Sequence, residues 1–103
     1  MTSTLLAGTP VHLDAEGYFT DPAEWTPDLA QEIAREEGIA LTDRHFDVLN
    51  YLRAQDAAGE KLTIRRVGKS DVTTIKEFYD LFPGGPLKKA SRIAGIPKPV
   101  SCV

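Results

Sequence analysis

Apolar residues recur three or four positions apart in several stretches of the chain, the spacing that places side chains on one face of a helix. Thr26 followed by Pro27 favours a helix start, and Gly38 favours the end of that helix. Thr42 likewise predicts the start of a second helix over residues 43–58. The apolar positions are Leu29, Ala30, Ile33 and Ala34 in the first helix, and Phe46, Leu49, Tyr51 and Leu52 in the second.

Two further helices are predicted in the last third of the chain. Ser70 or Asp71 opens the first of them, and prolines and glycines at residues 83–86 break it. Its apolar stripe, at i, i+3, i+4 and i+7, consists of Ile75, Phe78, Tyr79 and Phe82 and predicts packing into a core. A short last helix is expected from Pro86 to Ala94, with Gly95 as its stop.

Two other regions have weaker patterns. Val11 to Leu13 and Tyr18 to Thr20 flank a turn that contains Gly17, so a small β-hairpin is expected there. Residues 59–69 predict a loop with a short strand or turn. The chain of 103 residues has room for one domain. We therefore expect a mainly α fold: a small helical bundle with a helix-turn-helix-like core and an N-terminal β-hairpin.

The charged residues are divided unevenly along the chain. Residues 1–60 carry twelve acidic and three basic side chains, a net charge of −9. Residues 61–103 carry three acidic and nine basic side chains, a net charge of +6. This division favours attraction between the two halves, with an acidic partner or nucleic acid as the alternative target of the basic half.

The single cysteine excludes an intrachain disulfide, and Cys102 with two separated histidines, His12 and His45, offers no metal-ligand spacing. We expect neither a metal nor a cofactor. No apolar run approaches the roughly 20 residues that span a bilayer, and the first residues lack the charged region of a signal peptide. The sequence therefore predicts a cytoplasmic monomer that does not contact a membrane.

The last nine residues predict a flexible arm, residues 95–103, on a domain of residues 1–94. Pro97 and Pro99 forbid helix and favour an extended backbone. Cys102 is next to the end of the chain, where residues are usually exposed. A thiolate is the form of cysteine that attacks sulfur. We interpret Cys102 as a thiol that carries sulfur.

The residues of the arm resemble the end of a known family. The stretch LFPGGPLKKASRIAGIPKPVSCV at residues 81–103 is similar to the C-terminus of the DsrC/TusE family of sulfur-relay proteins. The DAEGYF, EW and LTDRHFDVLNYLR elements, at residues 14–19, 24–25 and 41–53, resemble the same family. The middle of the chain is shorter than in the usual member, with TIRRVGKS in place of part of a helix.

The resemblance implies a persulfide on Cys102, accepted from a sulfur-donor protein of the TusBCD or DsrEFH type and passed to an acceptor protein. In the TusE branch the sulfur moves toward thiolation of tRNA. The DsrC branch serves dissimilatory sulfite reductase and uses a second cysteine, whose position here is Ser91. Serine favours the single-thiol role. Heterodisulfide-reductase-like sulfur metabolism remains an alternative.

Five other residues are expected to support the arm: Arg92, Gly95, Pro97, Lys98 and Pro99. Arg92 and Lys98 could lower the pKa of the Cys102 thiol, and the terminal carboxylate opposes them. The expected thiol is therefore one that a partner activates.

Two other function classes are open at this point. The helices around residues 43–58 and 71–82 could form a DNA-binding helix-turn-helix, but Lys76 is the only basic residue of the second helix. The alternative of an independent enzyme lacks a Cys–His pair or a phosphate-binding loop. His45, in the first turn of its helix, favours a solvated or partly packed role.

Overall fold

The computed structural model describes residues 2–6 and 8–98, with side chains from residue 8 onward. Two antiparallel strands, β1 (Thr2–Leu6) and β2 (Thr9–Leu13), are followed by a short 3-10 helix, η1 (Pro22–Glu24). Five α-helices complete the described fold: α1 (Pro27–Glu36), α2 (Asp43–Ala57), α3 (Ile64–Gly68), α4 (Ile75–Leu81) and α5 (Pro86–Ile93). None of the helices in this part of the chain is long and apolar enough to cross a membrane.

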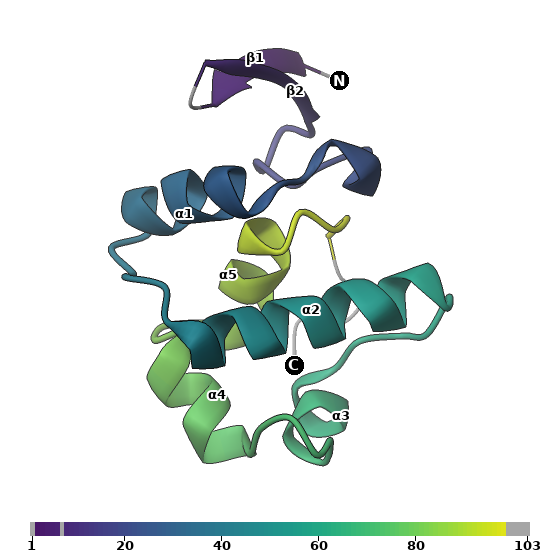
Figure 1. Ribbon diagram of the computed structural model, residues 1–103. Helices are drawn as coiled ribbons and strands as arrows, with labels where there is room; N and C mark the ends of the chain where they lie inside the picture. The colour runs from purple at the N-terminus through teal and green to yellow at the C-terminus, as the bar shows by residue number, and fades with distance from the viewer. Residues whose placement is uncertain (1, 7, 99–103) are drawn as a thin grey trace.

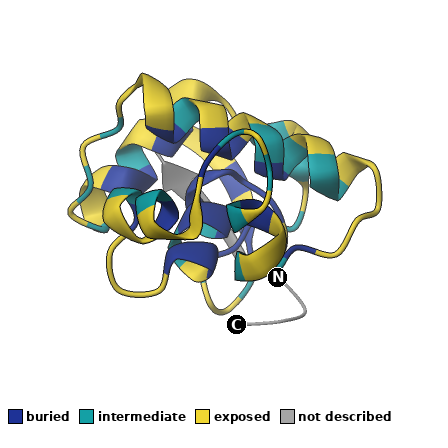
Figure 2. Ribbon diagram, turned by 90° about the horizontal axis from the view of Figure 1, so that it is seen from below, coloured by how far each residue is buried: buried dark blue, intermediate teal, exposed yellow. Residues whose placement is uncertain are grey.

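Helix α5 occupies the centre of the arrangement and contacts α1, α2 and α4 (Figure 1). Its inward face is fully or almost fully buried and consists of Pro86, Leu87, Ala90, Ser91 and Ile93. Figure 2 shows the buried segments turned toward the interior and the exposed ones along the outside. Three helices cover α5, and the residues that follow it are buried as far as Ile96.

Threonine begins four of the five helices. The side chains of Thr26, Thr63 and Thr74 each accept a hydrogen bond from the backbone N–H three residues later. At Thr42 the His45 ring takes part instead: its Nδ1 accepts from the Thr42 N–H at 3.1 Å. These caps satisfy donors that would otherwise lack a partner in the first turn.

His45 is a structural residue that links two helices. Its Nε2 lies 2.9 Å from the carbonyl oxygen of Leu81, and its ring packs edge-on against Phe82 at 5.1 Å. A neutral ring with the proton on Nε2 donates to Leu81 and accepts at Nδ1, so both nitrogens have a partner. The side chain is buried, with 7% of the residue exposed, which is deeper than a helix-start position suggests.

The hairpin predicted over residues 11–20 is not confirmed. Strand β2 pairs instead with β1, which precedes it in the chain, and Thr4 lies opposite Val11. With the segment that follows β2, the pairing is limited to a single bridge between Leu13 and Phe19. The carboxylate of Asp14 accepts from the backbone N–H of Glu16 and of Tyr18 and closes the turn between them.

Two predictions for residues 59–82 are also wrong. Residues 64–68 form helix α3 in place of a strand or turn, and α4 begins at Ile75 rather than at Ser70 or Asp71. The hydroxyl of Ser70 donates to the carbonyl of Val67 at 2.6 Å and helps to close α3 instead. Within α4 only one row of the predicted stripe is buried, Phe78 and Phe82, whereas Ile75 and Tyr79 are 43% and 47% exposed.

An ion pair joins α4 to α2. Arg44 donates to both carboxylate oxygens of Glu77, at 2.6 and 3.2 Å, and to the carbonyl of Val72 at 2.6 Å. These donors, with the hydroxyl of Thr73, hold the pKa of Glu77 below its ordinary value. With Glu77 facing α2, the Ile75–Tyr79 row turns toward solvent.

Candidate functional site

Two of the residues predicted for the site, Pro99 and Cys102, lie outside the described residues. The structure describes the residues that precede them, up to Lys98. Gly95 and Ile96 are buried, although the sequence assigned them to the arm, and Pro97 and Lys98 are exposed. We define the arm base as residues 93–98 together with the side chains that hold them.

Trp25 covers the chain as it leaves α5. Its indole Nε1 donates to the carbonyl of Ile93 at 2.8 Å. Gly95 lies against the indole, and a Cβ atom there would stand 2.6 Å from both Cβ and Cγ of Trp25. Gly95 also has a φ of +71°, which favours glycine. Only glycine therefore fits this position without displacement of Trp25.

Arg53 holds the same segment from α2. Its guanidinium donates to the carbonyl of Ala94 at 2.9 Å and to that of Pro22 at 3.0 Å. The guanidinium carbon lies 4.3 Å from the centroid of the Trp25 ring, a cation–π contact. Burial lowers the pKa of Arg53, but a guanidinium stays charged under physiological conditions. Arg53 thus joins η1, α2 and the end of α5.

Arg92 and Lys98 are both paired with carboxylates. Arg92 donates to Glu37 at 2.7 Å, to Glu36 at 3.1 Å and to the carbonyl of Gly17 at 3.2 Å. Lys98 donates from Nζ to a carboxylate oxygen of Glu16 at 2.8 Å. These pairs offset the positive charge of both side chains, which therefore anchor the arm base to α1 and to the turn at residues 14–17.

The arm base brings together the separate stretches that carry the family resemblance. The DAEGYF element supplies Glu16 and Gly17, the EW element supplies Trp25, and the LTDRHFDVLNYLR element supplies Arg53. Trp25 and Arg53 were not identified as site residues from the sequence. The resemblance of their stretches was the only signal, because their contacts join positions 68 and 41 residues apart.

Ser91 lies inside the fold. Its exposed fraction is 0%, and its hydroxyl has no hydrogen-bond partner among the described residues. Leu87, Ala90 and Ala94 share its buried face of α5. The position that carries a second cysteine in the DsrC branch is therefore a packing position here, with a small polar side chain among apolar ones.

Replacing Ser91 with Ala should raise the free energy of unfolding by about 1 kcal/mol, because a buried hydroxyl without a partner is costly and alanine favours helix. Urea unfolding followed by circular dichroism measures the change. Ser70→Ala is the matched control, because that hydroxyl donates to Val67 at 2.6 Å. Its removal should lower the same free energy by about 1 kcal/mol. A loss in both variants would contradict the assignment of Ser91.

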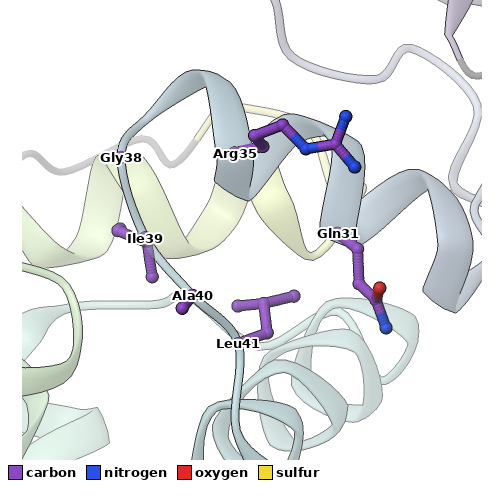
Figure 3. A pocket seen from close by; sticks show the side chains of 6 residues that line it. All are labelled: Gln31, Arg35, Gly38, Ile39, Ala40 and Leu41. Carbon is purple, nitrogen blue, oxygen red and sulfur yellow. The ribbon is translucent and has the colours of Figure 1, made fainter.

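A separate hollow of about 510 Å³ lies between α1 and the connection to α2 (Figure 3). Its lining consists of Gln31, Arg35, Gly38, Ile39, Ala40 and Leu41. None of these residues is a nucleophile or a general base at neutral pH. Across residues 2–6 and 8–98, no group of three or more His, Cys, Asp or Glu side chains could hold a metal ion. The arm base is therefore the stronger candidate site.

Comparisons with known proteins agree with the resemblance. Residues 5–103 match the family model described as DsrC like protein. Sulfurtransferase TusE of Sodalis glossinidius is 36% identical over 93% of this chain and 96% of its own. The solution structure of Allochromatium vinosum DsrC is 33% identical, covers 98% of this chain and 97% of its own, and superposes with a TM-score of 0.78. The oxidised DsrC of Archaeoglobus fulgidus, the gamma-subunit of dissimilatory sulfite reductase, is 32% identical over 99% of this chain and 100% of its own, with a TM-score of 0.80. The chain belongs to the DsrC/TusE family.

Proposed function

We propose that this protein is a cytoplasmic sulfur carrier that holds a persulfide on Cys102 and hands it from a donor protein to an acceptor protein. The observation that carries the proposal is the placement of its single cysteine. Cys102 lies four residues beyond Lys98, and Trp25, Arg53 and Arg92 hold the arm base that precedes it.

The transfer needs no outside oxidant. The thiolate of Cys102 attacks the terminal sulfur of a donor persulfide, the S–S bond of the donor breaks, and the donor leaves as a thiolate that takes up a proton. Cys102 then carries the terminal sulfur as its own persulfide. In the second transfer, an acceptor thiolate attacks the terminal sulfur of the Cys102 persulfide. The S–S bond breaks, and Cys102 leaves as a thiolate that takes up a proton.

The TusE-like branch, with delivery toward tRNA thiolation, fits the chain better than the sulfite-reductase branch. Serine at position 91 cannot form a disulfide, and its side chain is buried within α5. Release of the sulfur from Cys102 therefore cannot use a second thiol of the same chain and needs an external acceptor. Service to sulfite-reductase or heterodisulfide-reductase-like proteins is the alternative. Trapping of the mixed disulfide separates the two roles, because the captured acceptors differ in mass.

Incubation with inorganic polysulfide should add one sulfur atom to the protein, a gain of about 32 Da in intact mass, which dithiothreitol removes. The Cys102→Ala variant should show no gain in mass, because Cys102 is the single cysteine of the sequence. Thermal unfolding of both proteins confirms that they are equally folded. A sulfur adduct that persists in Cys102→Ala would exclude Cys102 as the carrier.

A further inference from the structure

A basic surface lies beside the place where the arm leaves the domain. It is formed by the α2–α3 connection and by α3, and it borders a hollow of about 500 Å³. The lining residues are Lys61, Thr63, Arg65, Arg66 and Lys69, and all four cationic residues among them are exposed. We refer to these four cations as the α3 basic surface.

Most of this positive charge has no partner within the described part of the chain. Arg66 is paired with Glu60 at 3.3 Å. Lys61, Arg65 and Lys69 have no carboxylate at ion-pair distance among the described residues. By contrast, the arm base pairs Arg92 and Lys98 with carboxylates. Of the exposed described cations without such a carboxylate, three gather on the α3 basic surface and two, Lys76 and Lys88, lie on α4 and α5.

The α3 basic surface adjoins the exit of the arm. A second hollow, of about 220 Å³, is lined by residues of the α2–α3 connection and by both Pro97 and Lys98. Lys61 lines this hollow as well as the one along α3. The two hollows therefore meet at Lys61, between the last described residues and the basic side chains.

The number of residues between Lys98 and Cys102 limits the distance of the thiol from this region. Cys102 is four residues beyond Lys98, so its Cα lies within about 13–14 Å of the Lys98 Cα on any path. A protein surface of standard size buries about 800 Å² on each partner, a disc of roughly 16 Å radius. The interface of a protein that bonds to the Cys102 sulfur close to the arm base is wide enough to reach Lys61, which lines the same hollow as Pro97 and Lys98.

We propose that the α3 basic surface docks an acidic patch of the protein that exchanges sulfur with Cys102. The proposal rests on the proposed function, in which a partner protein reaches that thiol. Charge complementarity of this kind raises the association rate and fixes the orientation of the partner more than it raises affinity. It would bring the partner to the arm before the sulfur is transferred.

A protein partner fits this surface better than nucleic acid. Residues 1–60 have a net charge of −9, so a protein whose negative charge is confined to one patch is repelled less than a continuous polyanion. Ile75 packs against Gly68 at the end of α3 and is 43% exposed, so an apolar side chain borders the cations. Apolar and arginine side chains together are typical of protein interfaces.

The test compares two synthetic peptides that each carry one cysteine as a mixed disulfide with 2-thiopyridine. One has aspartate and glutamate around its cysteine, and the other has asparagine and glutamine. The Cys102 thiolate attacks the peptide sulfur, a peptide–protein disulfide forms, and 2-thiopyridone leaves and is measured by absorbance. At low salt the acidic peptide should react about 3–10-fold faster, and the ratio should approach one at about 0.5 M salt.

The Arg65→Glu/Lys69→Glu variant should lose this preference. A matched control, Arg35→Glu/Lys88→Glu, changes the net charge equally on α1 and α5 and should retain it. Equal loss in both variants, or no preference in the native protein, would overturn the docking surface. Binding of a 20-base-pair duplex that only the α3 variant loses would assign the surface to nucleic acid and also overturn it. Sulfur uptake from polysulfide is a separate readout: its failure with the charge preference intact removes the carrier role and leaves the docking surface supported.

Discussion

Replacing Gly95 with Ala is expected to lower the free energy of unfolding by about 2–5 kcal/mol. Two costs add at this position. A left-handed backbone costs an alanine roughly 1–2 kcal/mol, and overpacking adds about 1–3 kcal/mol. The overpacking arises because the new Cβ would stand 2.6 Å from Cβ and Cγ of Trp25, which itself is held by Ile93 and Arg53. Urea unfolding monitored by circular dichroism measures the loss.

Gly59→Ala provides a matched control for the backbone cost alone. Gly59 has a φ of +76°, close to the +71° of Gly95, but no atom lies within 4 Å of the Cβ position. Its replacement should cost only about 1–2 kcal/mol. If the two variants lose the same free energy, Trp25 does not constrain the arm base.

The sequence predicts the longer helices well because their signals are local. Thr26 with Pro27 and the alanine-containing stripe locate α1, the cap at Thr42 locates α2, and Pro86 at the first helical position locates α5. In each case the residue that starts the helix is no more than four residues from the first turn that it stabilises. No long-range contact is needed to identify such an element.

Helix α3 was missed because five residues are too few to show a helical period. Thr63 caps it by accepting from the Arg66 N–H at 3.0 Å, as Thr26 caps α1. The same limit explains the misjudged face of α4. A stripe at i, i+3, i+4 and i+7 consists of two rows, and only tertiary contacts decide which row is buried. Here Phe82 packs against the ring of His45, 37 residues earlier in the chain, and Arg44 pairs with Glu77 beside it.

For the candidate site, the sequence predicts the chemistry but not the side chains that hold the arm base. The role of Cys102 stays a prediction, because this residue lies outside the described part of the chain. Cys102, Arg92 and Lys98 are identifiable from residue type and position near the end of the chain. The side chains that hold the arm base come from η1 and α2, and no local pattern links them to residue 95. The ion pairs of Arg92 with Glu36 and Glu37 also join positions more than 50 residues apart, so no local pattern could identify them.

Replacing Trp25 with Ala is expected to lower the free energy of unfolding by about 3 kcal/mol, through the loss of a large packed ring. The change also removes the hydrogen bond to Ile93 and the cation–π contact with Arg53. Amide hydrogen exchange should show where the loss is greatest. The N–H of Ile96, which donates to Ser91 at 3.2 Å, should lose more protection than amides in the middle of α2.

Trp25→Phe is the matched variant for this position. It keeps an aromatic face for Arg53 but leaves the Ile93 carbonyl without the Nε1 donor, so a loss of about 1 kcal/mol is expected. If Trp25→Ala lost no more than Trp25→Phe, the ring would contribute nothing beyond its hydrogen bond.

Combining Trp25→Ala with Gly95→Ala tests the contact between the two residues directly. Without the indole, an alanine at position 95 retains only the cost of its positive φ, about 1–2 kcal/mol. The double variant should therefore be more stable than the sum of the single losses predicts, by the overpacking cost of about 1–3 kcal/mol. Strict additivity would mean that the indole and the backbone at residue 95 act independently. A favourable coupling would show that Trp25 requires glycine at the base of the arm, because the ring and a Cβ atom compete for the same space.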